Sequence, residues 1–305
     1  ITEPGGGSDV ASLRTTARRD GGEWVIDGEK VFITSGLRAD WITVAVRTGD
    51  TGSKGARGIS MVAVPGNAPG LHRTELKKMG WWCSDTAQLR FDNLRVPAGH
   101  LLGEEGGGFR IIMTNFNGER LAMSAMALGF AQACHDEALD WARQRKTFGA
   151  ALIERQVIRH KLAEMATQVD VAREYAYRCA ARMQAGESAI AEVSMAKNFA
   201  TSVSTMVTDE AVQIFGGMGF VEETGAAQHM RDARVLAIYE GANGIQANDL
   251  VFRKLARDDG KEFNRYAAEM REIAKQCAAE TGDDIAAIAA SLTTSLGHLE
   301  QAAAY

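Results

Sequence analysis

Two glutamates in the sequence are candidates for removing a proton from carbon. Glu240 lies in the tripeptide Tyr239-Glu240-Gly241, in a predicted link between two helices, and Glu119 precedes Arg120 near the start of a long predicted helix. The glycine beside Glu240 gives the backbone freedom to reach a ligand. A carboxylate that a ligand buries, or that lies beside a second carboxylate, has a raised pKa and can act as a general base. Taken singly, each glutamate also fits an ordinary solvated charge, and Glu119 suits the positive end of a helix dipole.

Two further segments could bind phosphate or another polar ligand. The loop 2–9 is rich in glycine, which lets backbone N–H groups approach a ligand, and Thr2 and Ser8 add hydroxyl groups. At the end of the first long predicted helix, Arg145 and Thr147 could grip a phosphate. Other interpretations stay open, because a glycine-rich loop can be a flexible turn, and basic residues favour a helix C-terminus through its dipole alone.

The sequence pattern also predicts the elements that carry these residues. Residues 1 to about 105 are predicted to form a β-region. Apolar runs at 24–26 and 30–33 flank Asp27-Gly28, a pair typical of a tight hairpin turn. Further apolar runs follow at 41–46, 59–64 and 89–91. Short strands separated by Gly-, Ser- and Asn-rich links predict an antiparallel sandwich or barrel.

After the glycines at 106–108 the hydrophobic period becomes that of helices. Apolar residues recur at steps of three and four, or sums of them, in the stretches 121–142, 158–183 and 195–206, and residues 248–257 are typical of the end of a fourth helix. Long amphipathic helices in series predict an up-down four-helix bundle. The Gly216-Gly217-Met218-Gly219 run follows a helix rather than a strand, which disfavours a Rossmann site.

The predicted class is therefore α+β, with three segments. They are a β-domain at 1–105, a helical bundle at 106–258 and an Ala-rich helical tail at 259–305 that is broken near 281–284. We expect the tail either to begin a further helical extension at the C-terminus or to form a helical hairpin. Such a hairpin would pack on the bundle or at a subunit interface.

Composition narrows the function classes. The 305 residues carry a net charge of −5, which argues against a nonspecific nucleic-acid or anionic-membrane surface. No apolar run reaches the roughly 18 residues of a membrane helix, and the 4 cysteines are far apart, so no metal site and a reducing compartment are expected. The first residues resemble neither a signal nor a transit peptide, and we expect the sequence to begin mid-protein.

Several motifs in order resemble those of the acyl-CoA dehydrogenase family. They are TEPGGGSD at 2–9, a hairpin-like run ending Phe32-Ile33-Thr34-Ser35, RKTFG at 145–149, QIFGGMGF at 213–220, Arg231-Asp232-Ala233 and Tyr239-Glu240-Gly241. The resemblance runs from residue 1 to about 257. It implies a middle β-domain and a C-terminal four-helix bundle, while the family's N-terminal helical domain is absent from this sequence. It also implies an FAD cofactor and a homotetramer (or dimer).

The resemblance assigns roles to residues. Near the flavin it implies Ile1, Thr2, Gly7, Ser8, Phe32, Ile33 and Thr34, and, toward the FAD of a neighbouring subunit, Arg145, Thr147, Phe148, Gln156, Gln213, Gly216 and Gly217. For the substrate it implies Ser8, Asn117, Arg120, Tyr239 and Gly241. Most members have the base at the position of Glu240, and a subset that includes isovaleryl-type enzymes has it at that of Glu119; Glu240 is favoured here. Ala242 and Gly244 depart from the family's usual polar residues, which weakens the FAD contacts expected there.

The implied reaction is α,β-dehydrogenation of an acyl-CoA thioester, as in the β-oxidation of fatty acids. An electron-transfer flavoprotein would accept the electrons, in the cytoplasm of a bacterium or the mitochondrial matrix of a eukaryote. Two alternatives remain: a relative that acts on a non-CoA substrate such as a nitroalkane, and a non-catalytic FAD protein that protects nucleic acid. The glutamate at 240 counts against the first, and the net charge of −5 against the second.

Overall fold

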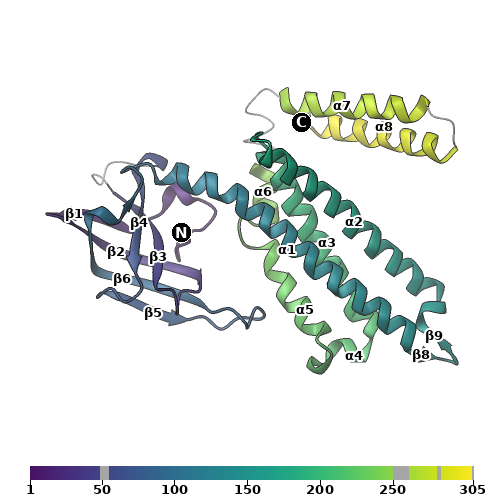
Figure 1. Cartoon of the computed structure of the whole chain (residues 1–305), viewed down its shortest axis with the longest axis horizontal. Coiled ribbons are helices and arrows are strands. Elements are labelled where there is room, and N and C mark those ends of the chain that lie inside the picture. Colours follow the sequence, from purple (N-terminus) through teal and green to yellow (C-terminus); the bar gives the residue numbers. More distant parts are fainter. Residues whose placement is uncertain (49–54, 250–260, 280–282, 304–305) are drawn as a thin grey trace. The chain divides into compact units, whose positions relative to one another are not determined.

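The chain forms two compact units, Ile1–Asn243 and Gly244–Tyr305. The computed structural model describes residues 1–48, 55–249, 261–279 and 283–303 (Figure 1). The first unit contains a β-sheet and the long helices, and the second contains the final helices. Among the described residues, no helix is both long enough and apolar enough to cross a bilayer.

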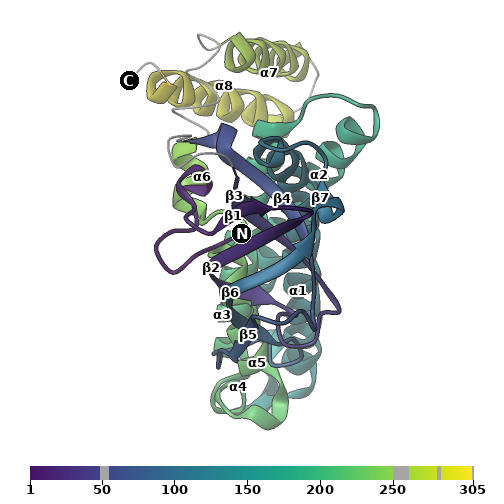
Figure 2. The same cartoon turned by 90° about the vertical axis from the view of Figure 1, so that its left-hand side faces the viewer.

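A seven-stranded sheet makes up the N-terminal part of the first unit. Its strands are β1 (Thr16–Asp20), β2 (Glu23–Thr34), β3 (Trp41–Arg47), β4 (Ile59–Pro65), β5 (Leu71–Glu75), β6 (Thr86–Pro97) and β7 (Leu101–Leu102). They are hydrogen-bonded in the order β5-β6-β2-β1-β3-β4-β7, and Figure 2 shows β1, β2 and β6 running alongside one another. Neighbours are antiparallel except β1 and β3, which share one parallel bridge.

The two halves of the sheet enclose one apolar core. Trp24 of β2 and Leu89 of β6 belong to the same buried cluster as Val44 of β3 and Val62 of β4. A single bridge joins the halves, so these side chains meet because the sheet folds over on itself, as two packed sheets do. The predicted α+β class with an antiparallel, sandwich-like β-domain is confirmed.

The predicted hairpin turn at Asp27-Gly28 is wrong. β2 runs through this point, and the turn between β1 and β2 lies at Gly21-Gly22. The pairing of β2 with β6 shifts register at Gly28, which therefore forms a bulge. Its φ is +144°, and a Cβ there would lie 2.7 Å from the Cα of Thr15. A bulge and a tight turn both need such a glycine, so the dipeptide does not distinguish them.

Three long helices follow the sheet: α1 (Gly108–Gln144), α2 (Gln156–Gln184) and α3 (Ile190–Phe215). The hairpin of β8 (Lys146–Thr147) and β9 (Ala150–Ala151) joins α1 to α2, and a short loop joins α2 to α3, so successive helices reverse direction (Figure 1). Small and larger side chains fill their common core, among them Ala131, Ala138, Met165, Val169 and Val207. The three predicted helical stretches are confirmed, and most of the fourth, at 248–257, lies outside the described residues.

The loop before β6 also contacts the helices of the first unit, through Trp81 and Asp232. After α4 (Gly217–Phe220) the chain forms α5 (Ala226–Ala233). The Trp81 backbone N–H donates to Asp232 Oδ1 at 2.6 Å, and the Trp81 indole Nε1 donates to the Asp232 carbonyl at 2.7 Å. Gly80 allows this approach, because a Cβ there would lie 2.6 Å from the Arg231 carbonyl oxygen. The Arg231-Asp232-Ala233 motif therefore docks the loop between β5 and β6 onto α5.

The second unit contains α7 (Lys261–Ala279), α8 (Asp283–Ala303) and all but the first residue of α6 (Asn243–Asp249). α7 and α8 pack against each other. Their buried side chains are mostly alanines: Ala267 and Ala274 on α7, and Ala289 with Leu296 on α8. The helical tail predicted from the sequence is confirmed in these two helices, and part of the predicted break at 281–284 lies outside the described residues.

Candidate active site

The loop that follows α5 presents Glu240 in a strained backbone conformation. Its φ is +54°, a left-handed value that costs a non-glycine residue about 1 kcal/mol or more. Two helices hold this backbone: Arg120 Nε of α1 lies 3.5 Å from the Glu240 carbonyl oxygen and donates to it. Lys197 Nζ of α3 donates to the Gly241 carbonyl at 2.8 Å. The surroundings therefore impose the conformation of Glu240, as is common at functional sites.

The carboxyl groups of Glu240 and Glu119 interact. Burial, together with the hydrogen bond and charge of Glu119, raises the pKa of Glu240 to about 7, although the Arg120 guanidinium opposes this rise. Glu119 is held by Asn115, whose amide donates to it from the preceding turn of α1. A neighbouring carboxylate disfavours ionisation, so Glu240 holds its proton more tightly than an isolated glutamate does. Glu240 can therefore take up a proton near neutral pH, as a general base must.

The N-terminal segment lies against the end of β2. The Thr2 carbonyl accepts a hydrogen bond from the Val31 N–H at 2.9 Å. Glu3 is buried and accepts hydrogen bonds from Lys30 Nζ and from the Thr15 hydroxyl, each at 2.7 Å. Burial alone would raise the pKa of Glu3, but these and two backbone N–H donors lower it to about 2. An ionised anchor thus fixes the start of the glycine-rich loop beside β2.

The same segment reaches α1. Ile1 packs against an apolar cluster that contains Ile112 and includes Phe116 at its edge. Asn117 and Arg120 follow within the next turn of the helix. The structure therefore links Ile1 and Thr2 to β2 and α1, and Glu119 and Arg120 to Glu240. The predicted site residues on these segments are here called the sheet-side group: Ile1, Thr2, Gly7, Ser8, Phe32, Ile33, Thr34, Asn117, Glu119, Arg120, Tyr239, Glu240 and Gly241.

The remaining predicted residues lie at the far ends of the long helices. This hairpin-side group consists of Arg145, Thr147, Phe148, Gln156, Gln213, Gly216 and Gly217. Stacking of Trp141 on Phe215, with ring centroids 4.9 Å apart, holds the end of α1 beside the end of α3. At the α-helical rise of about 1.5 Å per residue, Arg120 lies roughly 36 Å from the end of α1. One chain therefore does not bring the two groups together.

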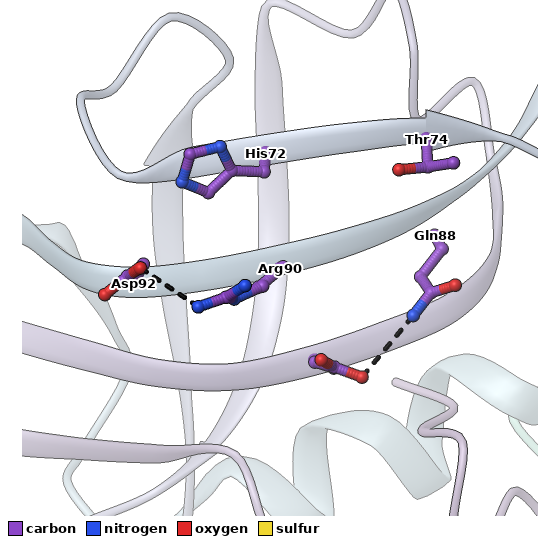
Figure 3. Close-up of a pocket in the computed structure, with 6 residues that line it drawn as sticks. His72, Thr74, Gln88, Arg90 and Asp92 are labelled. Carbon is purple, nitrogen blue, oxygen red and sulfur yellow. Dashed lines mark hydrogen bonds and ion pairs between the residues drawn. The ribbon is translucent and has the colours of Figure 1, made fainter.

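A shallow polar groove of about 420 Å³ lies elsewhere, on the solvent face of β2, β5 and β6 (Figure 3). Its lining residues are Glu29, His72, Thr74, Gln88, Arg90 and Asp92. Arg90 pairs with Asp92 at 3.1 Å, and Gln88 donates to Glu29 at 3.4 Å. None of these residues was predicted to serve the site, and the groove adds nothing to it.

Sequence reasoning missed Lys197, which lies on the buried face of α3 and holds the Glu240 loop, and Trp81, which joins the loop before β6 to α5. A lysine at a buried helical position is a signal that could have been used, because lysine is almost never fully buried without a partner. That partner, Gly241, is 44 residues further along the chain.

Comparison with known proteins gives the class to which this fold and site belong. The family model "Acyl-CoA dehydrogenase, middle domain" matches residues 1–94, and "Acyl-CoA dehydrogenase, C-terminal domain" matches residues 106–255. The chain is 44% identical over 247 residues to the cyclohexane-1-carbonyl-CoA dehydrogenase of Geobacter metallireducens. The aligned region makes up 81% of this chain and 64% of that protein. The chain belongs to the acyl-CoA dehydrogenase family.

Solved structures agree with this assignment. A probable acyl-CoA dehydrogenase from Mycobacterium abscessus is 51% identical with a TM-score of 0.81, over 83% of this chain and 67% of that one. Butyryl-CoA dehydrogenase from Megasphaera elsdenii is 39% identical with a TM-score of 0.78, over 81% of this chain and 64% of that one. The family consists of FAD-binding oxidoreductases. The chain spans less than two thirds of the length of the curated relatives that it matches.

The residues present fit a flat, phosphate-bearing cofactor. Phe32 and Phe148 have positive φ values of 60° and 51°, and their side chains are 69% and 100% exposed. Large aromatic side chains held outward in strained conformations suit a planar ring system. Gly216 and Gly217 have open space beyond their Cα atoms, so their backbone can approach a ligand closely. The exposed Arg145 adds a guanidinium group suited to phosphate.

Proposed function

We propose that this chain carries out the α,β-dehydrogenation of an acyl-CoA thioester to the trans-2-enoyl-CoA. The observation that carries the proposal is the carboxyl pair, in which the pKa of Glu240 is about 7 because of burial and the adjacent Glu119. The names of the relatives support the substrate class, since they include cyclohexane-1-carbonyl-CoA and short-chain acyl-CoA dehydrogenases.

Glu240 is the proposed base. Its ionised carboxylate takes the α proton, and the electron pair of that C–H bond forms the new double bond as the β hydrogen leaves as hydride. The acceptor of that hydride is FAD, when bound. Hydrogen bonds to the thioester oxygen are needed as charge develops there. Arg120 lies beside Glu240 and favours its ionised form, and Asn117 lies one turn earlier toward the proposed CoA arm.

Two groups of residues are proposed to hold FAD. In the sheet-side group, Phe32, Ile33 and Thr34 would lie against the flavin with Ile1, Thr2, Gly7 and Ser8. The hairpin-side group would contact the FAD of a neighbouring subunit, in a homotetramer or dimer. The separation of roughly 36 Å along α1 supports this division. So does Phe148, whose side chain is 100% exposed at the tip of the β8–β9 hairpin.

The proposed electron acceptor is an electron-transfer flavoprotein. The relatives include bacterial proteins and proteins named as mitochondrial, so the bacterial cytoplasm or the mitochondrial matrix is the proposed location. Both straight-chain and branched acyl groups remain candidates, since the relatives include short-chain and isobutyryl-CoA dehydrogenases.

An anaerobic flavin titration tests the function. The FAD-loaded chain is mixed with a panel of straight and branched acyl-CoAs, and bleaching of the flavin band by one of them is expected. Glu240→Gln should slow that bleaching by about 10²- to 10⁴-fold, the usual contribution of a general base. Glu164→Gln, at an exposed position of α2, is the matched control and should leave the rate unchanged. Bound flavin that no thioester bleaches would refute the proposal.

The pH dependence assigns the base within the pair. The rate of bleaching should rise as the pH passes about 7, where Glu240 ionises. Because Glu119 raises the pKa of Glu240, Glu119→Gln should move that midpoint to lower pH while bleaching persists. If Glu119→Gln abolished bleaching and Glu240→Gln did not, Glu119 would be the base.

A further inference from the structure

Lys197 is buried in the helical core and has no part in the proposed mechanism. Its side chain is 0% exposed. Its ammonium group donates to the Gly241 carbonyl at 2.8 Å and to Asn243 Oδ1 at 3.0 Å. Both acceptors are uncharged, and no carboxylate in the described residues forms an ion pair with Lys197. A buried ammonium whose hydrogen-bond acceptors are all neutral is expensive to desolvate, so it contributes little to folding.

Neighbouring side chains of α3 bind the same segment. The Thr201 hydroxyl, one helical turn after Lys197, donates to Asn243 Oδ1 at 3.2 Å. Asn198 Nδ2 donates to the Asn243 carbonyl at 3.3 Å. Together these three side chains of α3 hold Gly241 and Asn243, in the segment that follows Glu240.

We propose that Lys197 is a positioning residue, which fixes the direction of the Glu240 carboxylate by holding Gly241 and Asn243. The proposal rests on the proposed function of Glu240. Because Glu240 has a φ of +54°, its backbone can relax to an unstrained conformation once its neighbours are released. A carboxylate moved by about 1 Å can cost roughly 100-fold in rate, so this anchoring matters for catalysis.

The charge of Lys197 acts on the same site. The charged groups that face it are Arg120 from α1 and Glu240 from the loop. Burial and the charge of Arg120 lower the pKa of Lys197 to about 8, and the charge of Glu240 opposes the change. The attraction between Lys197 and Glu240 is mutual, so the ammonium also favours the ionised form of Glu240.

Hydrogen exchange of the loop tests the anchoring without using activity. In Lys197→Met, the amides of residues 239–243 should exchange about tenfold faster, because the loop opens more often. Lys197→Gln keeps a donor and should restore part of the protection. Thr208→Val is the matched control: Thr208 is also buried on α3, and its hydroxyl bonds only within the helix, to the Ser204 and Thr205 carbonyls. Exchange that is unchanged in Lys197→Met would overturn the proposal.

Single-turnover reduction of the FAD-loaded protein tests the catalytic consequence. Lys197→Met should slow bleaching about 10- to 100-fold, while the thioester dissociation constant changes less than about threefold. The pH midpoint for ionisation of Glu240 should also rise, since a neighbouring positive charge is lost. A merely structural residue would not move that midpoint, and an unchanged rate and midpoint would overturn the proposal.

Two further outcomes keep the tests separate. If no thioester bleaches the wild-type protein, the proposed function fails, and hydrogen exchange still decides whether Lys197 holds the loop. If Lys197→Met does not fold, Asn243→Ala removes one of the two acceptors and leaves Lys197 in place. It should accelerate exchange at 239–241 in the same direction, by a smaller factor, and no acceleration there would refute the anchoring.

Discussion

The sheet and the helical core each bury one lysine, and the two lysines bind their surroundings in the same pattern. Lys30 donates to the Ile1 carbonyl at 3.2 Å and to Glu3 Oε1 at 2.7 Å. Lys197 donates to the Gly241 carbonyl at 2.8 Å and to Asn243 Oδ1 at 3.0 Å. In both cases a backbone carbonyl and a side-chain oxygen two residues later are held. The side-chain oxygen belongs to a carboxylate beside Lys30 and to a neutral amide beside Lys197.

This difference assigns the two lysines different tasks. The charge of Lys30 is neutralised by Glu3, so it has little effect on groups outside the ion pair. The pair fixes the N-terminal loop. Lys197 hydrogen-bonds only neutral acceptors among the described residues, and the charge of the Glu240 carboxylate acts on it without direct contact. A buried ion pair is costly to break, whereas a buried unpaired charge contributes little to stability and is retained for another reason. Substitution of Lys30 should therefore lower stability more than activity, and substitution of Lys197 should lower activity more than stability.

The largest effect on stability is expected at the ion pair. Lys30→Met leaves Glu3 buried with its counter-ion removed, which should lower the free energy of unfolding by about 3–5 kcal/mol. Urea denaturation measures the change. The double variant Lys30→Met with Glu3→Gln removes both charges and should recover much of the loss. Equal losses in the single and double variants would mean that packing, rather than the charge pair, sets the stability there.

Acid should remove the same contribution by titration. Glu3 has a pKa of about 2 in the folded chain against an ordinary value of 4.5, so its stabilisation is complete above about pH 4.5 and is lost as the pH falls toward 2. The expected loss is about 3 kcal/mol, because the two pKa values differ by about 2.5 and each pKa unit corresponds to roughly 1.4 kcal/mol. Denaturation at a series of pH values measures it, and Glu3→Gln should flatten the curve in this range. A wild-type curve that is already flat below pH 4.5 would contradict the depressed pKa.

The sequence pattern predicted the order of elements better than their turns. The change from short strands to helical periods near Gly108 marks where α1 begins, because a period of two and a period of 3.6 are distinct over long runs. Gly28 was placed in a turn because its bulge depends on Thr15, which meets it only in the folded sheet. Local sequence reports that a glycine is needed, and tertiary contact decides for what purpose.

The same distinction between local sequence and tertiary contact applies to the residues of the candidate site. Glu240 and Arg120 were found because their motifs are local, and the structure brings them within 3.5 Å. Lys197 was missed because its burial depends on Gly241, which is distant in the sequence and adjacent in space. The interaction of Glu119 with Glu240 was foreseen as a hypothesis, since both positions carry glutamate, and its effect on the pKa required the burial of the loop.

The smallest effect on stability, and the sharpest test of the comparison, is expected from Asn243→Asp. This change places a carboxylate where Lys197 now meets an amide, and so makes the helical lysine resemble Lys30. The new pair gains attraction but must desolvate a second charge, so the free energy of unfolding should change by less than about 1 kcal/mol. Activity should respond more, because the charge of Lys197 is then matched by Asp and no longer favours ionised Glu240.

The added negative charge also raises the pKa of Glu240 directly, in the same direction. The midpoint of the pH–rate curve for flavin reduction should therefore move about half a unit to one unit above its wild-type value. At pH values well above that midpoint Glu240 is ionised in both proteins and the rates should converge, because the hydrogen bonds that hold Gly241 are kept. A midpoint that stays in place would mean that Lys197 acts on the loop through its hydrogen bonds alone. A rate that remains low at high pH would instead mean that the Asn243 amide itself is needed to hold the backbone.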